Sequence, residues 1–312
     1  MNDAATRACA ELGLGDIVGS DDLAGGIICR TRRLRTTSGI SVVAKQLAEP
    51  MPGFFRGEAD SLAAIDGVGW RVPRVLAARH DVLVLEYLGD AHQPAANYWE
   101  QLARAWARLH GRLGSRFGWE RDLHYGLVLQ DNHWREDGWD FYAETRFRCW
   151  LKGPRCGEWL DARDRSNLER VAARLRELVP AQGPALLHGD LWSGSLLVDA
   201  HGGPAVVDPS VHYGWPEADL HNAWIFGLWP ARFWDAYREC HHLEPGWQER
   251  LDLSAWVLTR QEAIAEGWFG EVRPRLGRAA HHGDAALFGR KQAIDDAQQR
   301  GLSAARGADQ RD

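Results

Sequence analysis

The chain has 312 residues, of which 45% are hydrophobic and 26% are charged, and its formal net charge at pH 7 is -6. This composition is that of an ordinary globular protein, and the acidic balance excludes a general nucleic-acid binder, which needs a basic excess. No apolar run approaches the roughly 18 residues of a membrane span, and the first residues lack a secretory signal, so we expect a cytoplasmic protein without a membrane partner.

Residues 1–88 predict a small, mostly antiparallel β lobe that carries one helix. After a short helix and an approach segment in residues 1–20, residues 21–47 have two β-rich arms around the turn sequence TTSG, which is typical of a hairpin. The pair Gly25 and Gly26 opens the first arm. Residues 54–65 have helical spacing, and residues 71–88 predict two strands joined at the sequence ARHD.

Residues 89–312 predict a larger, mostly helical lobe. Residues 97–114 place five apolar side chains, from Trp99 to Leu113, on one helical face. A second helix is predicted to be capped by Ser166 and Glu169, and short apolar segments with Gly-containing turns follow it. Residues 216–300 have a helical pattern, and we expect residues 301–312 to be disordered. The predicted fold class is therefore α+β, with two lobes and a nucleotide in the cleft between them.

Phosphoryl transfer from ATP needs few parts, and the first lobe has candidates for three of them. A glycine turn lets the backbone approach the phosphates, and Gly25 and Gly26 suit that role. Only three of the 37 basic side chains are lysine, and Lys45 ends the apolar strand VVAK, where a cation can hold the α- and β-phosphates. Glu58, at the start of the next helix, can pair with Lys45. The alternatives are a solvated lysine and a helix first-turn acid.

The second lobe supplies a candidate base and candidate metal ligands. Asp190, in the sequence HGD, can accept a hydroxyl proton during transfer, and His188 is better placed to brace the loop. Asp208 follows a buried strand 18 residues after Asp190, a spacing that suits a magnesium ligand. An acid at a strand end is also a common turn former. The order and spacing of these residues favour a kinase.

The same residues resemble the fructosamine kinase (ketosamine-3-kinase) family, which belongs with the aminoglycoside-phosphotransferase-like, protein-kinase-like fold. The matching segments are LLHGDLWSG, VVDPSVHYGWPEADL, FFRGEADSL, LVLEYL and QDNHW, and the likeness covers roughly residues 20–270. The resemblance implies a kinase that uses ATP and Mg²⁺ on ribulosamines or fructosamines of small amines or protein lysines. It also implies Lys45 on the phosphates, Glu58 as its anchor, Asp190 as the base and Asp208 as the main metal ligand.

Two further groups of residues follow from the resemblance and the sequence together. Glu86 and Leu88 are expected at the hinge between the lobes, where backbone groups would contact adenine. Trp192, in the loop after the base, is a candidate for contact with the acceptor. Glu217 and Asp219 are candidates for an acidic acceptor cleft that favours a cationic amine, although acids are also common at a helix N-terminus.

Two departures from the family pattern keep alternatives open. Ser195 stands where the family has an asparagine, and its hydroxyl would bind magnesium directly or through a water molecule. Trp215 and Pro216 stand where the family usually has His-Arg, which bears on the acceptor. An aminoglycoside-type small-molecule kinase and a nucleotide-binding pseudokinase therefore remain beside the ketosamine kinase. The sequence does not indicate an oligomeric state.

Overall fold

A five-stranded antiparallel sheet, in the strand order β1-β2-β3-β5-β4, forms the N-terminal part of the chain. The computed structural model describes residues 4–23, 28–89, 93–152, 162–225, 229–248 and 250–251. The strands are β1 (Ile17–Asp22), β2 (Arg30–Thr36), β3 (Ser41–Gln46), β4 (Val75–Ala78) and β5 (Leu83–Glu86). Two helices accompany them, α1 (Ala4–Glu11) and α2 (Phe54–Asp66).

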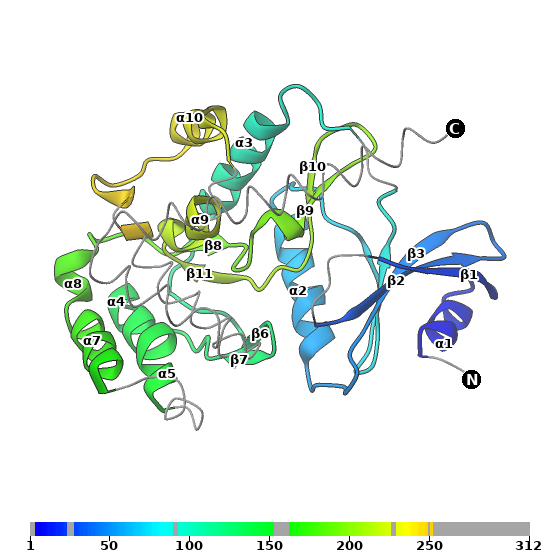
Figure 1. Ribbon diagram of the computed structural model, residues 1–312, viewed down its shortest axis with the longest axis horizontal. Helices are drawn as coiled ribbons and strands as arrows, with labels where there is room; N and C mark the ends of the chain where they lie inside the picture. The colour runs from blue at the N-terminus through cyan, green and yellow to red at the C-terminus, as the bar shows by residue number, and fades with distance from the viewer. Residues whose placement is uncertain are drawn as a thin grey trace.

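The two faces of this sheet are covered by different helices (Figure 1). Side chains alternate along a strand, so Val42 and Ala44 of β3 face α1 on the outer side. Lys45 points the other way, toward α2, and its paired neighbour Leu83 packs in the core with Phe55 and Leu62 of α2. The register of the sheet therefore places one lysine on the inner face, beside the helix that carries Glu58.

The rest of the chain combines helices with three two-stranded sheets, β6–β7, β8–β11 and β9–β10 (Figure 1). Helix α3 (Tyr98–His110) packs against α10 (Ala231–Cys240). The other helices are α4 (Gly138–Tyr142), the π-helix η1 (Ala143–Arg148), α5 (Cys149–Lys152), α7 (Ala162–Ala173), α8 (Leu175–Leu178), the 3-10 helix η2 (Ser193–Ser195) and α9 (Pro216–Ile225). The strands are β6 (Leu123–Tyr125), β7 (Val128–Gln130), β8 (Ala185–Leu187), β9 (Leu196–Val198), β10 (Pro204–Val206) and β11 (His212–Gly214).

One apolar core runs through both parts of the molecule. It contains Leu83 and Leu85 of the sheet, Leu62 of α2 and Trp106 of α3, all at most 3% exposed. Burying side chains of this size contributes about 1.5–3 kcal/mol each to the stability of the fold. The α+β class is confirmed, whereas the division of the chain into lobes at residue 88 stays a prediction.

The hairpin predicted from TTSG is confirmed. Gly39 has a φ of 81° in the turn, where a side chain would be strained, and its N–H donates to the Thr36 carbonyl at 2.9 Å. The helix at residues 54–65 and the two strands on either side of ARHD are confirmed as α2, β4 and β5.

Three details of the predicted elements were wrong. Residues 17–22 form β1, whereas the residues up to 20 were expected to form only an approach segment before the hairpin. Helix α7 begins at Ala162, so Ser166 lies inside it and does not cap it. Helix α3 ends at His110, so Leu113 lies beyond the apolar face and is 68% exposed. The predictions for residues 252–312 lie outside the described residues.

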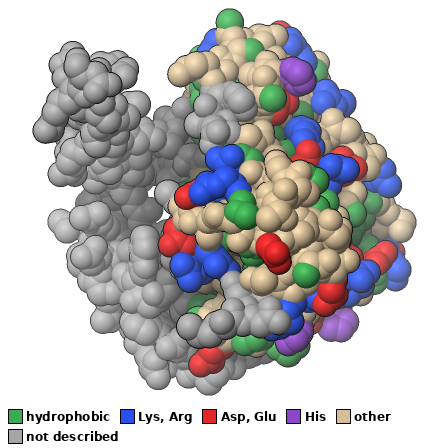
Figure 2. Space-filling view, turned by 90° about the vertical axis from the view of Figure 1, so that its right-hand side faces the viewer, with side chains coloured by type: hydrophobic (Ala, Val, Ile, Leu, Met, Phe, Trp, Pro, Cys, Tyr) green, Lys and Arg blue, Asp and Glu red, His purple; other side chains and the backbone are tan. Residues whose placement is uncertain are grey.

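The surface of the sheet mixes charges of both signs. Figure 2 shows basic and acidic side chains interspersed on the side of the molecule that carries α1 and the sheet. The arginines of the sequence RTRRLRT in β2 lie opposite acids of β1, with Arg30 3.0 Å from Asp22 and Arg35 paired with Asp21. Neighbouring acids thus offset part of the basic charge of this strand. Within the described part of the chain, no helix has the length and apolar character needed to cross a membrane.

Candidate active site

Lys45 and Glu58 form a buried ion pair between β3 and α2. The Lys45 Nζ lies 2.7 Å from Glu58 Oε1 and 2.8 Å from Oε2, so the carboxylate accepts from the ammonium through both oxygens. Each side chain is only 9% exposed. Burial by itself would lower the pKa of Lys45, but the charges of Glu58 and Asp208 outweigh it and raise that pKa. The lysine therefore remains a fixed positive charge on the inner face of the sheet.

Asp208 completes this cluster from the far end of the chain. Its Oδ1 lies 2.7 Å from the Lys45 Nζ, although the two residues are 163 positions apart in the sequence. Asp208 has a φ of 60°, the left-handed conformation that an aspartate tolerates better than most residues. Its side chain remains 44% exposed. One carboxylate of the cluster is therefore open to solvent, as a ligand for an incoming cation must be.

The HGD loop connects β8 to the turn that precedes η2, and its shape depends on Gly189. This residue has a φ of 81°, and a Cβ placed on it would lie 1.9 Å from the Ser210 carbonyl oxygen. A side chain of any kind would therefore break the close approach of the loop to the segment before β11. The Ser210 N–H donates to the His188 carbonyl at 2.9 Å, which fixes the loop just before Asp190.

Asp219 holds this loop through hydrogen bonds to its backbone. Its carboxylate is therefore buried behind the loop and not placed in the open acceptor cleft that the sequence had predicted. Its oxygens accept from the backbone N–H groups of His188 and Gly189, both at 2.9 Å. The Trp106 Nε1 donates to the same carboxylate at 2.8 Å, and the His110 Nε2 lies 3.1 Å away. The side chain is 1% exposed, so this carboxylate supports the HGD loop and is shielded from solvent.

Hydrogen bonding and charge, rather than burial, account for the ionisation of Asp219. Burial by itself would raise the pKa of Asp219, but the hydrogen bond and charge of His110 outweigh it and hold the pKa far below the usual range. The sequence carried one signal for this contact, since His110 lies four residues after Trp106 on the apolar face of α3. A polar residue at such a position requires a buried partner.

Glu217 also lies inside the protein rather than in an exposed cleft. Its oxygens accept from Arg250, whose Nε and Nη2 each lie 2.6 Å away, and its side chain is 4% exposed. The pair is bidentate, so the charge that was predicted to attract an amine is neutralised by an arginine. Sequence reasoning did not identify Arg250, because its partner is 33 positions away and no local pattern connects them.

Ser195 braces the loop in this structure. It is fully buried, and its Oγ donates to the Asp190 carbonyl at 3.0 Å. Its own carbonyl accepts from the Val207 N–H at 3.0 Å, one residue before Asp208. The two predicted metal ligands thus lie on connected segments, but the serine hydroxyl is turned toward the backbone. Ligation of a metal by Ser195 stays a prediction.

The remaining predicted site residues fall into three situations. Glu86 ends β5, and its carboxylate pairs with Arg71 at 2.8 Å, so only its backbone is left for the predicted hinge contact. Leu88, two residues after β5, and Trp192, just before η2, are both half-buried. The predictions of their contacts with adenine and acceptor stay open. The glycine pair at residues 25 and 26 lies outside the described residues.

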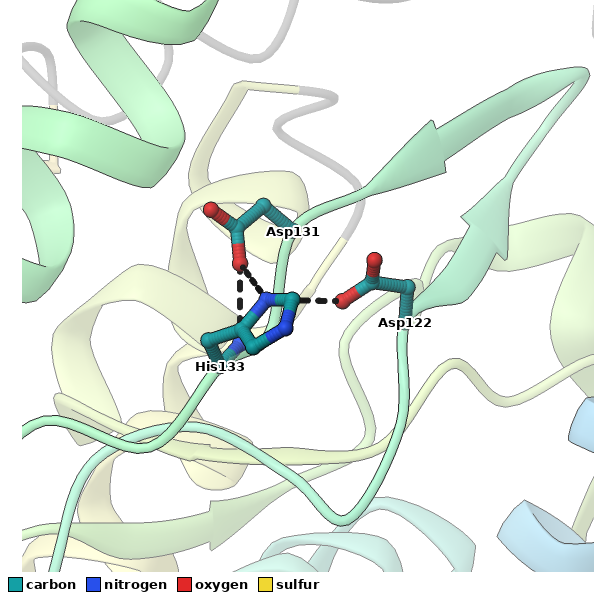
Figure 3. A group of neighbouring side chains, drawn as sticks. All are labelled: Asp122, Asp131 and His133. Atoms are coloured by element: carbon teal, nitrogen blue, oxygen red, sulfur yellow. Dashed lines mark hydrogen bonds and ion pairs between the residues drawn. The ribbon is translucent and has the colours of Figure 1, made fainter.

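A cluster of ionisable side chains beside the β6–β7 hairpin has the composition of a metal site but is already hydrogen-bonded (Figure 3). The His133 Nδ1 lies 2.7 Å from Asp131, and the Asn132 N–H donates to Asp122 at 2.9 Å. These hydrogen bonds fix the position of Asn132, whose Oδ1 accepts a hydrogen bond from the buried Arg146 at 2.6 Å. We interpret this cluster as a clamp on the chain after β7.

Comparison with known proteins gives a consistent result. The sequence model of the fructosamine kinase family matches residues 3–263. A probable ketoamine kinase of Enterococcus faecium is 31% identical over 256 residues, which are 80% of this chain and 90% of that protein. A crystal structure of a Thermobifida fusca protein assigned as a fructosamine-3-kinase has a TM-score of 0.74 and 26% identity, and the match covers 96% of this chain and 99% of that one.

A more distant structure, a thermostable mutant of an aminoglycoside phosphotransferase, has a TM-score of 0.57 and 13% identity. This match covers 94% of the present chain and 99% of the other. At this identity the likeness concerns the fold alone. It confirms the protein-kinase-like fold that the sequence predicted.

Proposed function

Because the chain belongs to the fructosamine kinase family, we propose that it transfers the γ-phosphoryl group of ATP to a sugar hydroxyl of a ketosamine. The observation that carries this proposal is the convergence of Lys45, Glu58 and Asp208 from distant parts of the chain. A cation held by a helix acid and approached by a half-exposed carboxylate is the arrangement that phosphate binding requires. Ribulosamines and fructosamines are the acceptors that we propose.

In this proposal Lys45 holds the α- and β-phosphates of ATP, and Glu58 fixes the position of its ammonium group. Asp208 would hold Mg²⁺, since carboxylate oxygens are the ligands that this ion prefers and this one is accessible. The ion would offset the negative charge that develops on the transferred phosphoryl group. Glu86 and Leu88 would mark the adenine end of the site.

Asp190 would act as the base. The bond between the acceptor oxygen and phosphorus forms while the bond to the ADP oxygen breaks, and the hydroxyl proton passes to the Asp190 carboxylate. The hydrogen bonds from His188, Gly189 and Ser195 hold the loop backbone, so this carboxylate needs little reorganisation to meet the hydroxyl. Trp192 would lie beside the acceptor.

The test is ADP release by the purified protein with magnesium and ATP, with and without a ribulosyl-amine or fructosyl-amine. We expect release that depends on the acceptor, and a loss of at least about 100-fold in the Asp190→Asn variant, because a positioned base contributes about that much. A basal rate that ketosamines do not stimulate would indicate another acceptor, such as an aminoglycoside. ATP binding with no ADP release would support the pseudokinase, which the buried hydroxyl of Ser195 favours.

A further inference from the structure

Arg71, in the segment between α2 and β4, is bonded to both ends of the proposed nucleotide site. Its carbonyl accepts from the Val206 N–H at 3.0 Å, and Asp208 follows two residues later. Its guanidinium pairs with the carboxylate of Glu86, the residue expected at the adenine end. One residue thus connects the strand that leads to the proposed metal ligand with the residue expected beside the nucleobase.

The guanidinium holds the Glu86 carboxylate through two hydrogen bonds. Arg71 Nη2 donates to Oε1 at 2.8 Å and Nη1 donates to Oε2 at 3.3 Å, while Nη1 also donates to the Val72 carbonyl at 2.6 Å. Such a fork fixes orientation as well as distance, because both partners are planar. The Arg74 N–H donates to the same carboxylate at 3.1 Å, and the Glu86 N–H donates to the Arg74 carbonyl at 2.9 Å. The last residue of β5 is therefore held by its side chain and by its backbone.

The carboxylate of this pair is ionised and partly shielded from water. The Glu86 side chain is 23% exposed and the Arg71 side chain is 39% exposed. Burial by itself would raise the pKa of Glu86, but the hydrogen bonds from Arg71 and from the Arg74 N–H outweigh it and lower that pKa. Salt screens a partly buried pair less than one on the open surface. The contact therefore persists at neutral pH.

The backbone of Arg71 is supported by the preceding residue. Trp70 is 2% exposed, and its ring centroid lies 6.4 Å from the ring centroids of Trp106 and His188. His188 belongs to the HGD loop, so the same short segment also packs against the loop that carries Asp190. Because its backbone is held in the core, the arginine can fix its partner only within a small range of positions.

We propose that Arg71 is a positioning residue for magnesium and ATP, which sets the position of the hinge at Glu86 relative to the carboxylate of Asp208. The proposal rests on the proposed function, since it assumes that adenine lies at the hinge and the metal lies at Asp208. ATP has to reach both ends at once, so a displaced hinge lowers its affinity although no group that contacts the nucleotide is removed. Arg71 acts on the nucleotide only through Glu86.

The experiment measures binding of adenylyl imidodiphosphate, a non-hydrolysable ATP analogue, with magnesium by titration calorimetry. In Arg71→Met we expect its Kd to rise about tenfold, the scale of one lost hydrogen bond to a charged group. Arg74→Met is the matched control, because that side chain is 77% exposed and its Nε lies 3.5 Å from the same carboxylate. The control should leave the Kd within about twofold of the wild type.

A second variant tests whether Arg71 acts through Glu86. Glu86→Gln should weaken binding by a similar factor, because glutamine cannot accept both hydrogen bonds of the fork. Arg71→Met in that background should add less than about twofold, since the two residues then share one effect. An unchanged Kd in Arg71→Met, an equal loss in Arg74→Met, or a further loss of about tenfold in the double variant would overturn the inference.

Steady-state kinetics separate this inference from the proposed function. In Arg71→Met the KM for ATP should rise about tenfold, while kcat at saturating ATP and the KM for the ketosamine stay unchanged. A parallel rise in the KM for the ketosamine would indicate general damage to the site and overturn the inference. If the wild type binds the analogue but phosphorylates no ketosamine, the proposed acceptor is rejected, and the binding comparison still decides the role of Arg71. Absence of analogue binding by the wild type would reject both proposals.

Discussion

The Lys45 cluster and the Asp219 cluster are both buried arrangements of charge, and they differ in which charge is at the centre. In the first, an ammonium is approached by two carboxylates, Glu58 and Asp208. In the second, a carboxylate is approached by four nitrogen atoms, two of them from the backbone of the catalytic loop. The first therefore has an excess of negative charge that a cation can neutralise, whereas the Asp219 carboxylate in the second is already surrounded by nitrogen atoms of the protein.

Exposure separates the two clusters further. The Asp208 side chain is 44% exposed, whereas the Asp219 side chain is 1% exposed. A group that must bind and release a ligand has to be accessible, but a group that supports a loop is better shielded from water. This difference supports our proposal that Asp208 serves chemistry while Asp219 supports the loop, and it yields predictions that separate activity from stability.

The largest effect is expected for Asp219→Ala. Removal of the carboxylate leaves buried N–H groups of the loop without an acceptor, which typically costs about 3–5 kcal/mol for a broken buried charge network. Urea unfolding followed by circular dichroism measures this loss. The rate of ADP formation should fall as well, because the loop that carries Asp190 loses its support. Wild-type stability in this variant would show that the network does not support the fold.

Asp208→Asn should show the opposite pattern. Because the side chain is half-exposed, we expect a change below about 1 kcal/mol in the free energy of unfolding. ADP formation should nevertheless fall at least about 100-fold, since the proposed magnesium ligand would be lost. The same urea titration and the coupled ADP assay measure both quantities. A variant that keeps the wild-type rate of ADP formation would show that Asp208 is not a metal ligand. The proposed contrast between a chemical role for Asp208 and a structural role for Asp219 would then fail.

The sequence was sufficient for the Lys45 cluster because each of its members has a local signature. Lys45 ends an apolar strand, Glu58 begins a helix, and Asp208 follows a buried strand. Their order along the chain is that of the kinase family that the sequence resembles, so no contact had to be known in advance. The structure adds the distances and the exposure of each side chain.

The acidic pair at the start of α9 was misinterpreted for a physical reason. Local sequence shows that Glu217 and Asp219 lie near a helix N-terminus, but it does not show whether the helix start faces water or the core. Burial is decided by segments that are distant in sequence, here α3 and the chain near Arg250.

The buried histidines near the loop provide a prediction of pH dependence. Burial lowers the pKa of His212 to about 3 and that of His188 to about 4. Both pKa values lie below the value of about 6.5 in the unfolded chain. At a pH between the folded and the unfolded pKa, the unfolded chain therefore binds protons that the folded chain does not bind. The free energy of unfolding then falls as the pH falls. Between pH 6.5 and 5 each histidine should cost about 2 kcal/mol.

Urea unfolding of the wild type and of His212→Gln at pH 7 and at pH 5 measures this dependence. The glutamine variant is expected to lose about 2 kcal/mol less than the wild type over that interval, because it has no group to protonate. An equal loss in both proteins would show that His212 does not couple protonation to unfolding. The Asp219 carboxylate should not contribute in this interval, since its pKa is held far below it.

The smallest effect is expected for Ser195→Ala. The variant removes the hydrogen bond from the Ser195 Oγ to the Asp190 carbonyl, which is worth about 1 kcal/mol. Ser210→Ala is the matched control, since its hydroxyl makes no hydrogen bond within the described residues. Because the Ser195 hydroxyl is buried and turned to the backbone, we expect the magnesium concentration for half-maximal ADP release to stay unchanged. An increase of more than about tenfold would assign the hydroxyl to the metal, and the Lys45 side of the comparison would then extend into the catalytic loop.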